Sequence, residues 1–507
     1  MSFKDLNIII DILPTLSNSE VRNVKKLAKV EFNSAVSKKI LVLFNKLRYP
    51  KSAISLKQES FKSDLDKRKR AEEYGRLRHV IEQSILLNIT QNQSEKYSDV
   101  FFNKFLVSLQ VIVAEIVKSR GLVDFSVKKL DHFEKVARDY QLYDQIIDIL
   151  HIKADLGYSG SIYYDLDKVL KEINFFENCR KRVNESKIIY RDYFSKNVKK
   201  GIQKGNVQII RSCLDRLEKF SKETRSNLIQ LKIYLFKMEL FLIQEKYHKG
   251  TETGLEAISF LHENQHIKTN TRTGYFYFNI AETELGALRF SKSLEYAIKA
   301  KSFVVENSLN RLISSQFFIL SSIYHKEPSK AIRELKELEQ LRILDSYPFY
   351  QSKFNYYQAM IYFIEEDFDR AWKALSIHFD LEKDKEGWRV WLSIMRILCQ
   401  IERREFVDVD LMVQTFKKYI KKWEERSEIR EREKLVFKII ESLNRNDFDY
   451  SSTNQEHADT LVLLKSKVKE LRWRPNSPEL IIFQDWFKSK VEKKPYSPSY
   501  SAYKLSD

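Results

Sequence analysis

Glycine and proline are scarce in this chain, and their scarcity restricts the fold more than any other feature. The 507 residues include 11 glycines and 8 prolines, well below the protein averages of about 7% and 5%. Tight hairpins between β-strands depend on Gly, Asn-Gly or Asp-Gly turns. Because these turn residues are rare, we expect an all-α chain with no sheet.

Apolar residues recur at helical spacing along most of the chain. From about residue 95, aromatic residues and leucines lie three or four positions apart, in stretches separated by short polar turns. This spacing places them on one face of an α-helix. A hydrophobic content of 43% is sufficient for a packed core. We expect more than about 70% of the residues to be helical, against the usual ~30–35%.

Three segments follow one template. Aligned on an aromatic residue of a first helix, they lie 40 and 39 residues apart, with anchors Tyr277, Phe317 and Tyr356. Each first helix carries a small residue, and these are Ala281, Ser321 and Ala359. Each second helix carries an alanine, and these are Ala297, Ala331 and Ala371. Small residues let two helices approach closely, while large aromatics fill the space between neighbouring pairs.

The third segment carries a family pattern. Its Ala359, Tyr362, Phe368 and Ala371 have the spacing found in tetratricopeptide (TPR) repeats, so the segments resemble that family. The other two copies depart from it: Glu284 replaces the first-helix aromatic in one, and the second helix of the other begins about two residues early. The N-terminal sequence "LSNSEVRNVKKLAK" is also similar to the start of a group of bacterial TPR-like proteins, which implies no function.

The resemblance implies an α-solenoid of stacked antiparallel helix hairpins, with five regions. They are a basic N-terminal helical module (1–95), degenerate helix hairpins (96–270), TPR-like repeats (271–450), C-terminal capping helices (451–490) and a tail (491–507). The tail contains Pro, Ser and Tyr without periodicity, and we expect it to be disordered.

Stacked hairpins of this kind leave a groove that binds extended or helical peptides. The candidate groove residues, on the first helices and the turn that follows, are Phe278, Glu282, Phe318, Ser322, His325, Lys326, Tyr356, Met360 and Phe363. We therefore expect a non-catalytic interaction scaffold that binds a protein or peptide partner. The alternative is that these aromatics only pack between repeats.

Positive charge is concentrated near the N-terminus. The chain has a net charge of +18, and residues 1–80 hold 18 Lys/Arg against 9 Asp/Glu. Such a surface can bind nucleic acid without sequence specificity, so a nucleic-acid-associated regulator is an alternative function. The candidate contacts are Lys67, Arg68, Lys69 and Arg70. They span about one helical turn and therefore point to all sides, which equally fits a solvated surface.

One motif suggests a metal site. Residues 262–266 read H-E-N-Q-H, and an H-E-x-x-H motif on a helix can bind zinc through both histidines, with the glutamate as general base. His262, His266 and a third ligand such as Glu282 would make a zinc hydrolase. This is the weakest alternative, because the motif lies at the end of a helix and runs into a polar turn.

The remaining sequence offers no catalytic pattern. It lacks a P-loop, a dinucleotide-binding fingerprint and a nucleophile elbow. The three cysteines, Cys179, Cys213 and Cys399, are far apart and odd in number, which is typical of a reducing compartment. We expect no enzyme activity, no cofactor and no bound metal.

The most apolar run after the N-terminus predicts no membrane insertion. It covers residues 105–117 and contains Gln110 and Glu115, and it is shorter than the ~18 residues that span a bilayer. The N-terminus carries Asp5 and Asp11 and is a poor secretory signal. We therefore expect a cytoplasmic protein.

Overall fold

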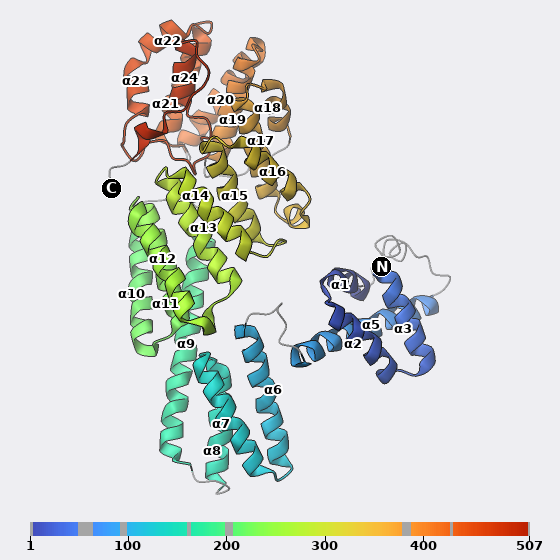
Figure 1. Ribbon diagram of the computed structural model, residues 1–507. Helices are drawn as coiled ribbons and strands as arrows, with labels where there is room; N and C mark the ends of the chain where they lie inside the picture. Colours follow the sequence, from blue (N-terminus) through green and yellow to red (C-terminus); the bar gives the residue numbers. More distant parts are fainter. Residues whose placement is uncertain are drawn as a thin grey trace. The chain divides into compact units, whose positions relative to one another are not determined.

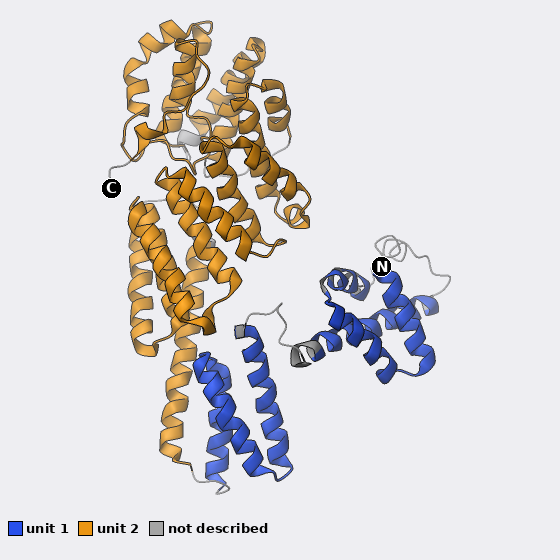
Figure 2. Ribbon diagram, viewed as in Figure 1, with its two compact units in different colours: residues 1–163 blue, residues 164–507 orange. Residues whose placement is uncertain are grey.

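The helical composition expected from the sequence is confirmed. A computed structural model describes residues 4–48, 64–91, 99–159, 164–197, 206–377, 387–425 and 429–504. These residues are 82% helical, form 23 α-helices and contain no strand (Figure 1). The chain divides into two compact units, Met1–Tyr163 and Tyr164–Asp507 (Figure 2). The division falls inside the region expected to hold degenerate hairpins.

Four helices at the start of unit 1 share one core. They are α1 (Lys4–Ile12), α2 (Asn18–Glu31), α3 (Ser34–Leu47) and α5 (Asp64–Gln91). α2 begins with a side-chain cap: Glu20 N–H donates to Ser17 Oγ at 3.2 Å, and Ser17 N–H donates to the Glu20 carboxylate at 2.6 Å. This reciprocal capping box satisfies two backbone donors at the helix start.

Three further helices of unit 1 pack on one another: α6 (Asp99–Ser119), α7 (Val123–Asp139) and α8 (Tyr143–Tyr158). The apolar part of α6 is longer than expected, because Val100–Ser119 is long and apolar enough to cross a membrane. The length of this helix therefore does not exclude a membrane span, and the absence of membrane insertion stays a prediction. Length and composition are the only support for such a span, and cytoplasmic localisation stays a prediction.

Unit 2 is a series of helices in which each packs on the next, except that the last packs on the helix two positions before it. The first part comprises α9 (Leu166–Asn197), α10 (Asn206–Thr224), α11 (Asn227–Ile243), α12 (Tyr247–Glu263), α13 (Asn270–Gly286), α14 (Phe290–Phe303), α15 (Leu309–Tyr324), α16 (Pro328–Glu339), α17 (Pro348–Ile364) and α18 (Phe368–Leu375). The second part comprises α19 (Trp388–Glu402), α20 (Phe406–Glu425), α21 (Glu431–Arg445), α22 (Tyr450–Glu456), α23 (Ala458–Leu464) and α24 (Phe483–Val491). Alternate helices α9, α11, α13, α15 and α17 also contact one another in order, and we call the surface that they share the odd-helix face.

The turns that follow α11, α13, α15, α17 and α19 repeat one backbone conformation. In each, a residue other than glycine has a φ between 60° and 63°: Glu245, Leu288, Lys326, Glu366 and Arg404. After α17, for example, Asp367 N–H donates to the carbonyl of Tyr362 at 2.9 Å. This is the Schellman pattern of helix C-termini, which usually places glycine at the left-handed position. These five turns thus have no glycine at the left-handed position, whereas the turn between α6 and α7 places Gly121 there, with a φ of 80°.

Small residues lie where helices approach most closely. Ala281, Ser321 and Ala359 are fully buried. The Ser293 hydroxyl, on α14, donates to the Ala281 carbonyl at 2.7 Å and lies 2.7 Å from the Ser321 hydroxyl. At Gly254 of α12, a Cβ would lie 2.4 Å from a side-chain carbon of Ile280. These contacts set the spacing of the hairpins.

Residues 491–504 of the C-terminal tail pack against the helices, contrary to expectation. Residues 491–504 lie within the described part of the chain, and Tyr500–Tyr503 form a 3₁₀ helix. Tyr503 is 2% exposed, and the Tyr500 ring lies 5.0 Å from that of Phe290. The prediction of disorder is wrong for these residues because aromatic side chains bury them against helices distant in sequence.

Candidate functional site

A hollow of about 220 Å³ lies on the odd-helix face, between α9, α11 and α13. Its lining comprises Tyr190, Leu228, Leu231, Lys232, Leu235, Thr271, Arg272, Tyr275 and Phe276. Most of these side chains are apolar or aromatic. Thr271 and the charged ends of Lys232 and Arg272 are the exceptions, and we call the hollow the Lys232–Arg272 pocket.

Lys232 lies on α11 without an acidic partner among the described residues. Its ammonium group donates to the Leu228 carbonyl, one turn earlier, at 3.2 Å. Burial, with smaller contributions from the positive charges of Lys187 and Arg272, lowers the pKa of Lys232 to about 8. No nearby carboxylate counters this shift, so the charged form of Lys232 is poorly compensated in this structure.

Arg272 supplies a second positive charge from the first turn of α13. Its guanidinium donates to the Ile267 carbonyl, and burial lowers its pKa. α13 starts at Asn270 and α11 at Asn227, so the pocket lies near two helix N-termini, where the backbone carries partial positive charge. A buried positive charge needs an anionic partner to offset its desolvation. The pocket is therefore suited to an anion with an apolar group.

Two tyrosines join opposite walls of the pocket. The hydroxyls of Tyr190, on α9, and Tyr275, on α13, lie 2.8 Å apart. Burial raises the pKa of both phenols, so they remain neutral at physiological pH and act only as hydrogen-bonding groups.

Acidic residues lie further along the same helices. Glu239 follows Lys232 by about two turns on α11, and Glu282 follows Tyr275 by about two turns on α13. Burial raises the pKa of both, and that of Glu282 reaches about 7 because Glu239 is also close. The odd-helix face is thus basic near the helix starts and holds carboxyl groups of raised pKa nearer the helix ends.

The chain's own residues 465–482, which we call the return segment, cover that second half of the face. The hydroxyl of Tyr324 donates to the Pro475 carbonyl at 3.2 Å, and that of Tyr356 donates to the Pro478 carbonyl at 3.1 Å. The Asn476 side chain bonds to Glu282. Earlier in the return segment, Arg472 and Arg474 both pair with Glu245, at 2.8 Å and 3.0 Å. The face therefore holds a non-helical peptide largely through main-chain carbonyls and arginines.

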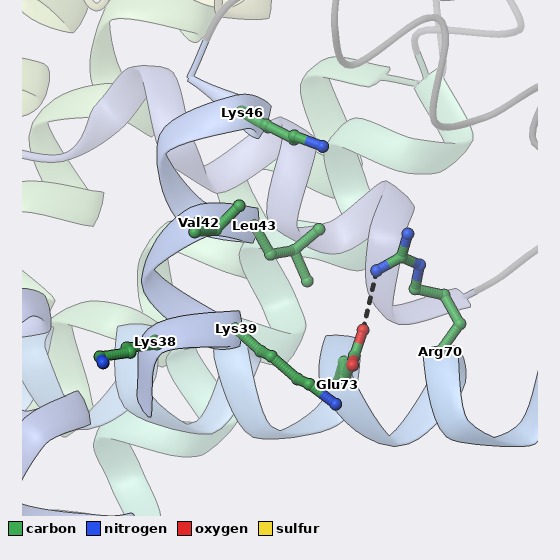
Figure 3. Close-up of a pocket in the computed structure, with 7 residues that line it drawn as sticks. All are labelled: Lys38, Lys39, Val42, Leu43, Lys46, Arg70 and Glu73. Carbon is green, nitrogen blue, oxygen red and sulfur yellow. Dashed lines mark hydrogen bonds and ion pairs between the residues drawn. The ribbon is translucent and has the colours of Figure 1, made fainter. Parts of the chain in front are cut away.

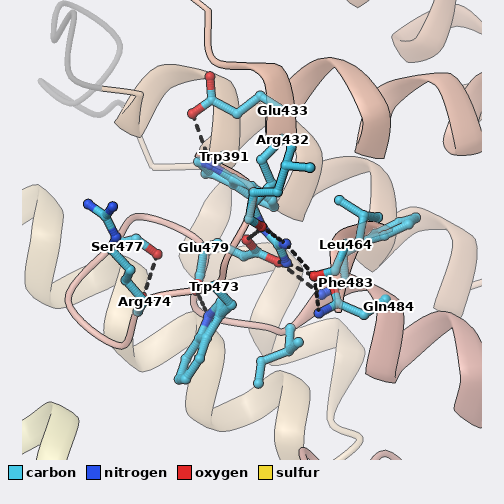
Figure 4. A network of polar contacts seen from close by, with 12 residues as sticks. Trp391, Arg432, Glu433, Leu464, Trp473, Arg474, Ser477, Glu479, Phe483 and Gln484 are labelled. Atoms are coloured by element: carbon cyan, nitrogen blue, oxygen red, sulfur yellow. Dashed lines mark hydrogen bonds and ion pairs between the residues drawn. The ribbon is translucent and has the colours of Figure 1, made fainter. Parts of the chain in front are cut away.

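A buried polar network fixes the end of the return segment (Figure 4). The Arg432 guanidinium, on α21, donates two hydrogen bonds to the Glu479 carboxylate and one to the Gln484 side chain at 2.8 Å. The Trp473 ring donates to the Glu479 carbonyl at 2.8 Å. These contacts hold the segment in place without secondary structure.

Most residues expected to line a groove lie inside the protein. The buried ones are Phe278, Ser322, Tyr356, Met360 and Phe363, while Glu282 and Phe318 are half-buried. His325 and Lys326 are exposed in the turn after α15. This burial supports the alternative that the aromatics pack between helices, and a partner at these residues stays a prediction.

Sequence reasoning missed the Lys232–Arg272 pocket. One signal was present, since Lys232 interrupts the strongly apolar run "LIQLKIYLFKMELFLI". Arg272 is 40 positions away, and nothing in the sequence shows that both side chains lie at one hollow without an acid.

The H-E-x-x-H motif does not form the expected helical arrangement. α12 ends at Glu263, and His266 lies in the 3₁₀ turn Gln265–Ile267, where its Nε2 is 2.9 Å from the Asn227 amide nitrogen. His262 is exposed, and its Nδ1 lies 3.1 Å from Lys268 Nζ. Among the described residues, no three His, Cys, Asp or Glu side chains form a group that could hold a metal ion.

The basic N-terminal residues are spread around α5. Lys67 and Arg70 are half-buried, Arg68 and Lys69 are exposed, and Arg70 pairs with Glu73 at 2.8 Å. A hollow of about 320 Å³ lies between α3 and α5 (Figure 3). It is lined by Lys38, Lys39, Val42, Leu43, Lys46, Arg70 and Glu73. The α3 lysines add positive charge that the sequence analysis did not select.

Comparisons of this chain with known protein families and with curated proteins found no match.

Proposed function

We propose that unit 2 is a non-catalytic, TPR-like α-solenoid that binds a peptide on the odd-helix face. The repeated hairpin turn and the contacts between alternate helices support the solenoid arrangement. One observation carries the binding role: the face already holds the return segment through tyrosine hydroxyls that bond main-chain carbonyls. Because hydrogen bonds of this kind are made to the main chain of a peptide, they hold an extended peptide with little dependence on its side chains.

The uncovered half of the face is the proposed peptide surface. It combines Tyr190 and Tyr275 with half-buried Gln316 and Tyr350, from the middle of α15 and the start of α17. Lys353, on α17, donates to Gln316 at 2.8 Å and lies 4.6 Å from the ring centre of Trp388. Aromatic side chains fixed in this way are typical anchors of protein interfaces.

A peptide array tests this function. Purified full-length protein is expected to select a set of peptides with a shared sequence pattern, and Tyr350→Ala should weaken the best of them by about 1–3 kcal/mol, the usual range for an anchor. Ile298→Ala is the matched control, because Ile298 is 50% exposed on the even-numbered helix α14. Absence of any selected peptide, or equal loss in both variants, would reject the proposal.

A second candidate function is non-specific nucleic-acid binding by the N-terminal bundle. Lys38, Lys39 and Lys46 line the hollow of Figure 3, and no ion pair of theirs occurs within the described residues. The experiment is titration of random-sequence DNA and RNA at several salt concentrations. Changing the three lysines to Glu should remove binding and its steep salt dependence. Changing Lys25, Lys26 and Lys29 of α2 to Glu provides a charge-matched comparison.

A further inference from the structure

The Lys232–Arg272 pocket is the size of a compact ligand. Its volume of about 220 Å³ lies below the ~300–1,000 Å³ of pockets that enclose drug-sized molecules. At the ~30 Å³ that a water molecule occupies in the liquid, it has room for roughly seven groups of that size. A carboxylate and the first carbons of its tail fill this volume, and because the hollow is open to solvent, the end of a medium-length tail can extend out along the face.

The charges in the pocket select an anionic head group. Lys232 and Arg272 each use one donor on a backbone carbonyl, and each keeps further N–H donors free for a ligand. A carboxylate presents two oxygens and can accept from both cations. Such charge-assisted bonds would supply the negative partner that the described residues do not provide.

The lining selects an apolar body for that ligand. Leu228, Leu231, Leu235 and Phe276 form most of the remaining wall. Burying a small aliphatic group against them is favourable. An anion with many polar oxygens would leave some of them against leucine side chains, where they find no donors. The pocket therefore favours one carboxylate joined to a hydrocarbon tail.

We propose that the Lys232–Arg272 pocket binds a small aliphatic carboxylate, of which octanoate is representative. The carboxylate bonds to Lys232 and Arg272, and the tail packs against the leucine and phenylalanine side chains. Tyr190 and Tyr275 join the walls of the pocket through their hydroxyls. This site goes beyond the proposed peptide binding, because it requires no protein partner.

Calorimetric titration of the full-length protein tests the proposal with four probes: octanoate, 1-octanol, acetate and inorganic phosphate. Octanoate is expected to bind at least tenfold more tightly than the other three. Lys232→Met and Arg272→Met should each weaken octanoate binding at least tenfold. Lys237→Met is the control, because Lys237 lies on the same helix but is 40% exposed and pairs with Glu218 at 3.7 Å.

Several outcomes would overturn the proposal. Equal binding of 1-octanol would show that the cations contribute nothing, and equal binding of acetate or phosphate would show that the tail contributes nothing. Failure of octanoate to bind at millimolar concentration would also reject it. Arg272→Met removes the hydrogen bond to the Ile267 carbonyl and could unfold the protein. In that case octanoate binding by Lys232→Met alone tests the proposal, after a melting curve has shown that the Lys232→Met variant is folded. None of these results bears on the peptide array, so the two proposals fail separately.

Discussion

Arg432 and Glu479 form a buried ion pair with two hydrogen bonds, which joins α21 to the end of the return segment. Their side chains are 7% and 2% exposed. The Arg432 guanidinium also donates to the carbonyls of Leu464 and Leu471. One arginine therefore fixes two points of the return segment, Leu471 and Glu479, together with Leu464 at the end of α23.

Replacing Arg432 with Met should destabilise unit 2 by about 3–5 kcal/mol, because it leaves the Glu479 carboxylate buried without its partner. Changing both residues to Met should cost less than the single change. Urea denaturation measures the loss. Lys299→Met, which breaks an exposed pair with Glu295, is expected to have a much smaller effect, and a similar loss in the two single variants would contradict the assignment.

Glu433 makes the stability of unit 2 dependent on pH. It accepts a hydrogen bond from the Trp391 ring at 3.1 Å and one from Arg430 N–H at 3.0 Å. Burial, with a smaller contribution from the charge of Glu479, raises its pKa to about 7 against the opposing charge of Arg430. The folded state therefore holds a proton that the unfolded state releases near pH 4.3, so stability present at low pH falls as the pH rises to about 7.

Glu433→Gln should flatten that dependence, because glutamine does not ionise. Between pH 5 and pH 8 the wild-type protein should lose on the order of 2–3 kcal/mol more than the variant. Denaturation at the two pH values measures the difference. Parallel pH profiles would show that Glu433 does not titrate in this range. Glu282→Gln is a second test, since the pKa of Glu282 is also about 7.

Local features of the fold were predictable from the sequence, whereas long-range ones were not. The cap at Ser17 and the hairpin of α17 and α18 depend on residues a few positions apart. The return segment depends on contacts such as that between Tyr324 and Pro475, which lie 151 positions apart. The tail likewise depends on distant contacts, such as that between the rings of Tyr500 and Phe290, and its sequence has no periodic pattern that predicts them.

The candidate site was missed for a related reason. Spacing within a helix shows that a residue such as Phe278 is apolar and faces a neighbour, but it does not show whether another segment covers it. The opposite holds for Lys232, whose charge suggests solvent exposure although it is half-buried beside Arg272. A binding site on this fold thus depends on which polar side chains lack partners. The pairing of those side chains is set by the assembled helices and not by the spacing within one helix.

Glycine at a hairpin turn should stabilise the protein. Glu366 is exposed and has a φ of 60°, a conformation that is unfavourable for residues with a Cβ. Glu366→Gly should raise the free energy of unfolding by about 0.5–1 kcal/mol. Arg333→Gly is the comparison, because Arg333 is exposed in the middle of α16, where glycine costs about 1 kcal/mol. Thermal melting should therefore show opposite shifts, and shifts of the same sign would contradict the turn assignment.

Lys232→Met should stabilise the free protein while it removes octanoate binding. The lowered pKa of Lys232, about 8, means that the folded state holds this proton less tightly than the unfolded chain does. The charged lysine therefore destabilises the fold at neutral pH, and stability should rise as the pH increases from about 8 toward 10.4. In the variant, the free energy of unfolding at pH 7 should increase by about 1–3 kcal/mol, and this rise with pH should diminish. Lys237→Met should change neither quantity. A residue needed only for folding would give the reverse result, a loss of stability, so a gain in stability together with lost binding identifies Lys232 as a residue kept for its ligand.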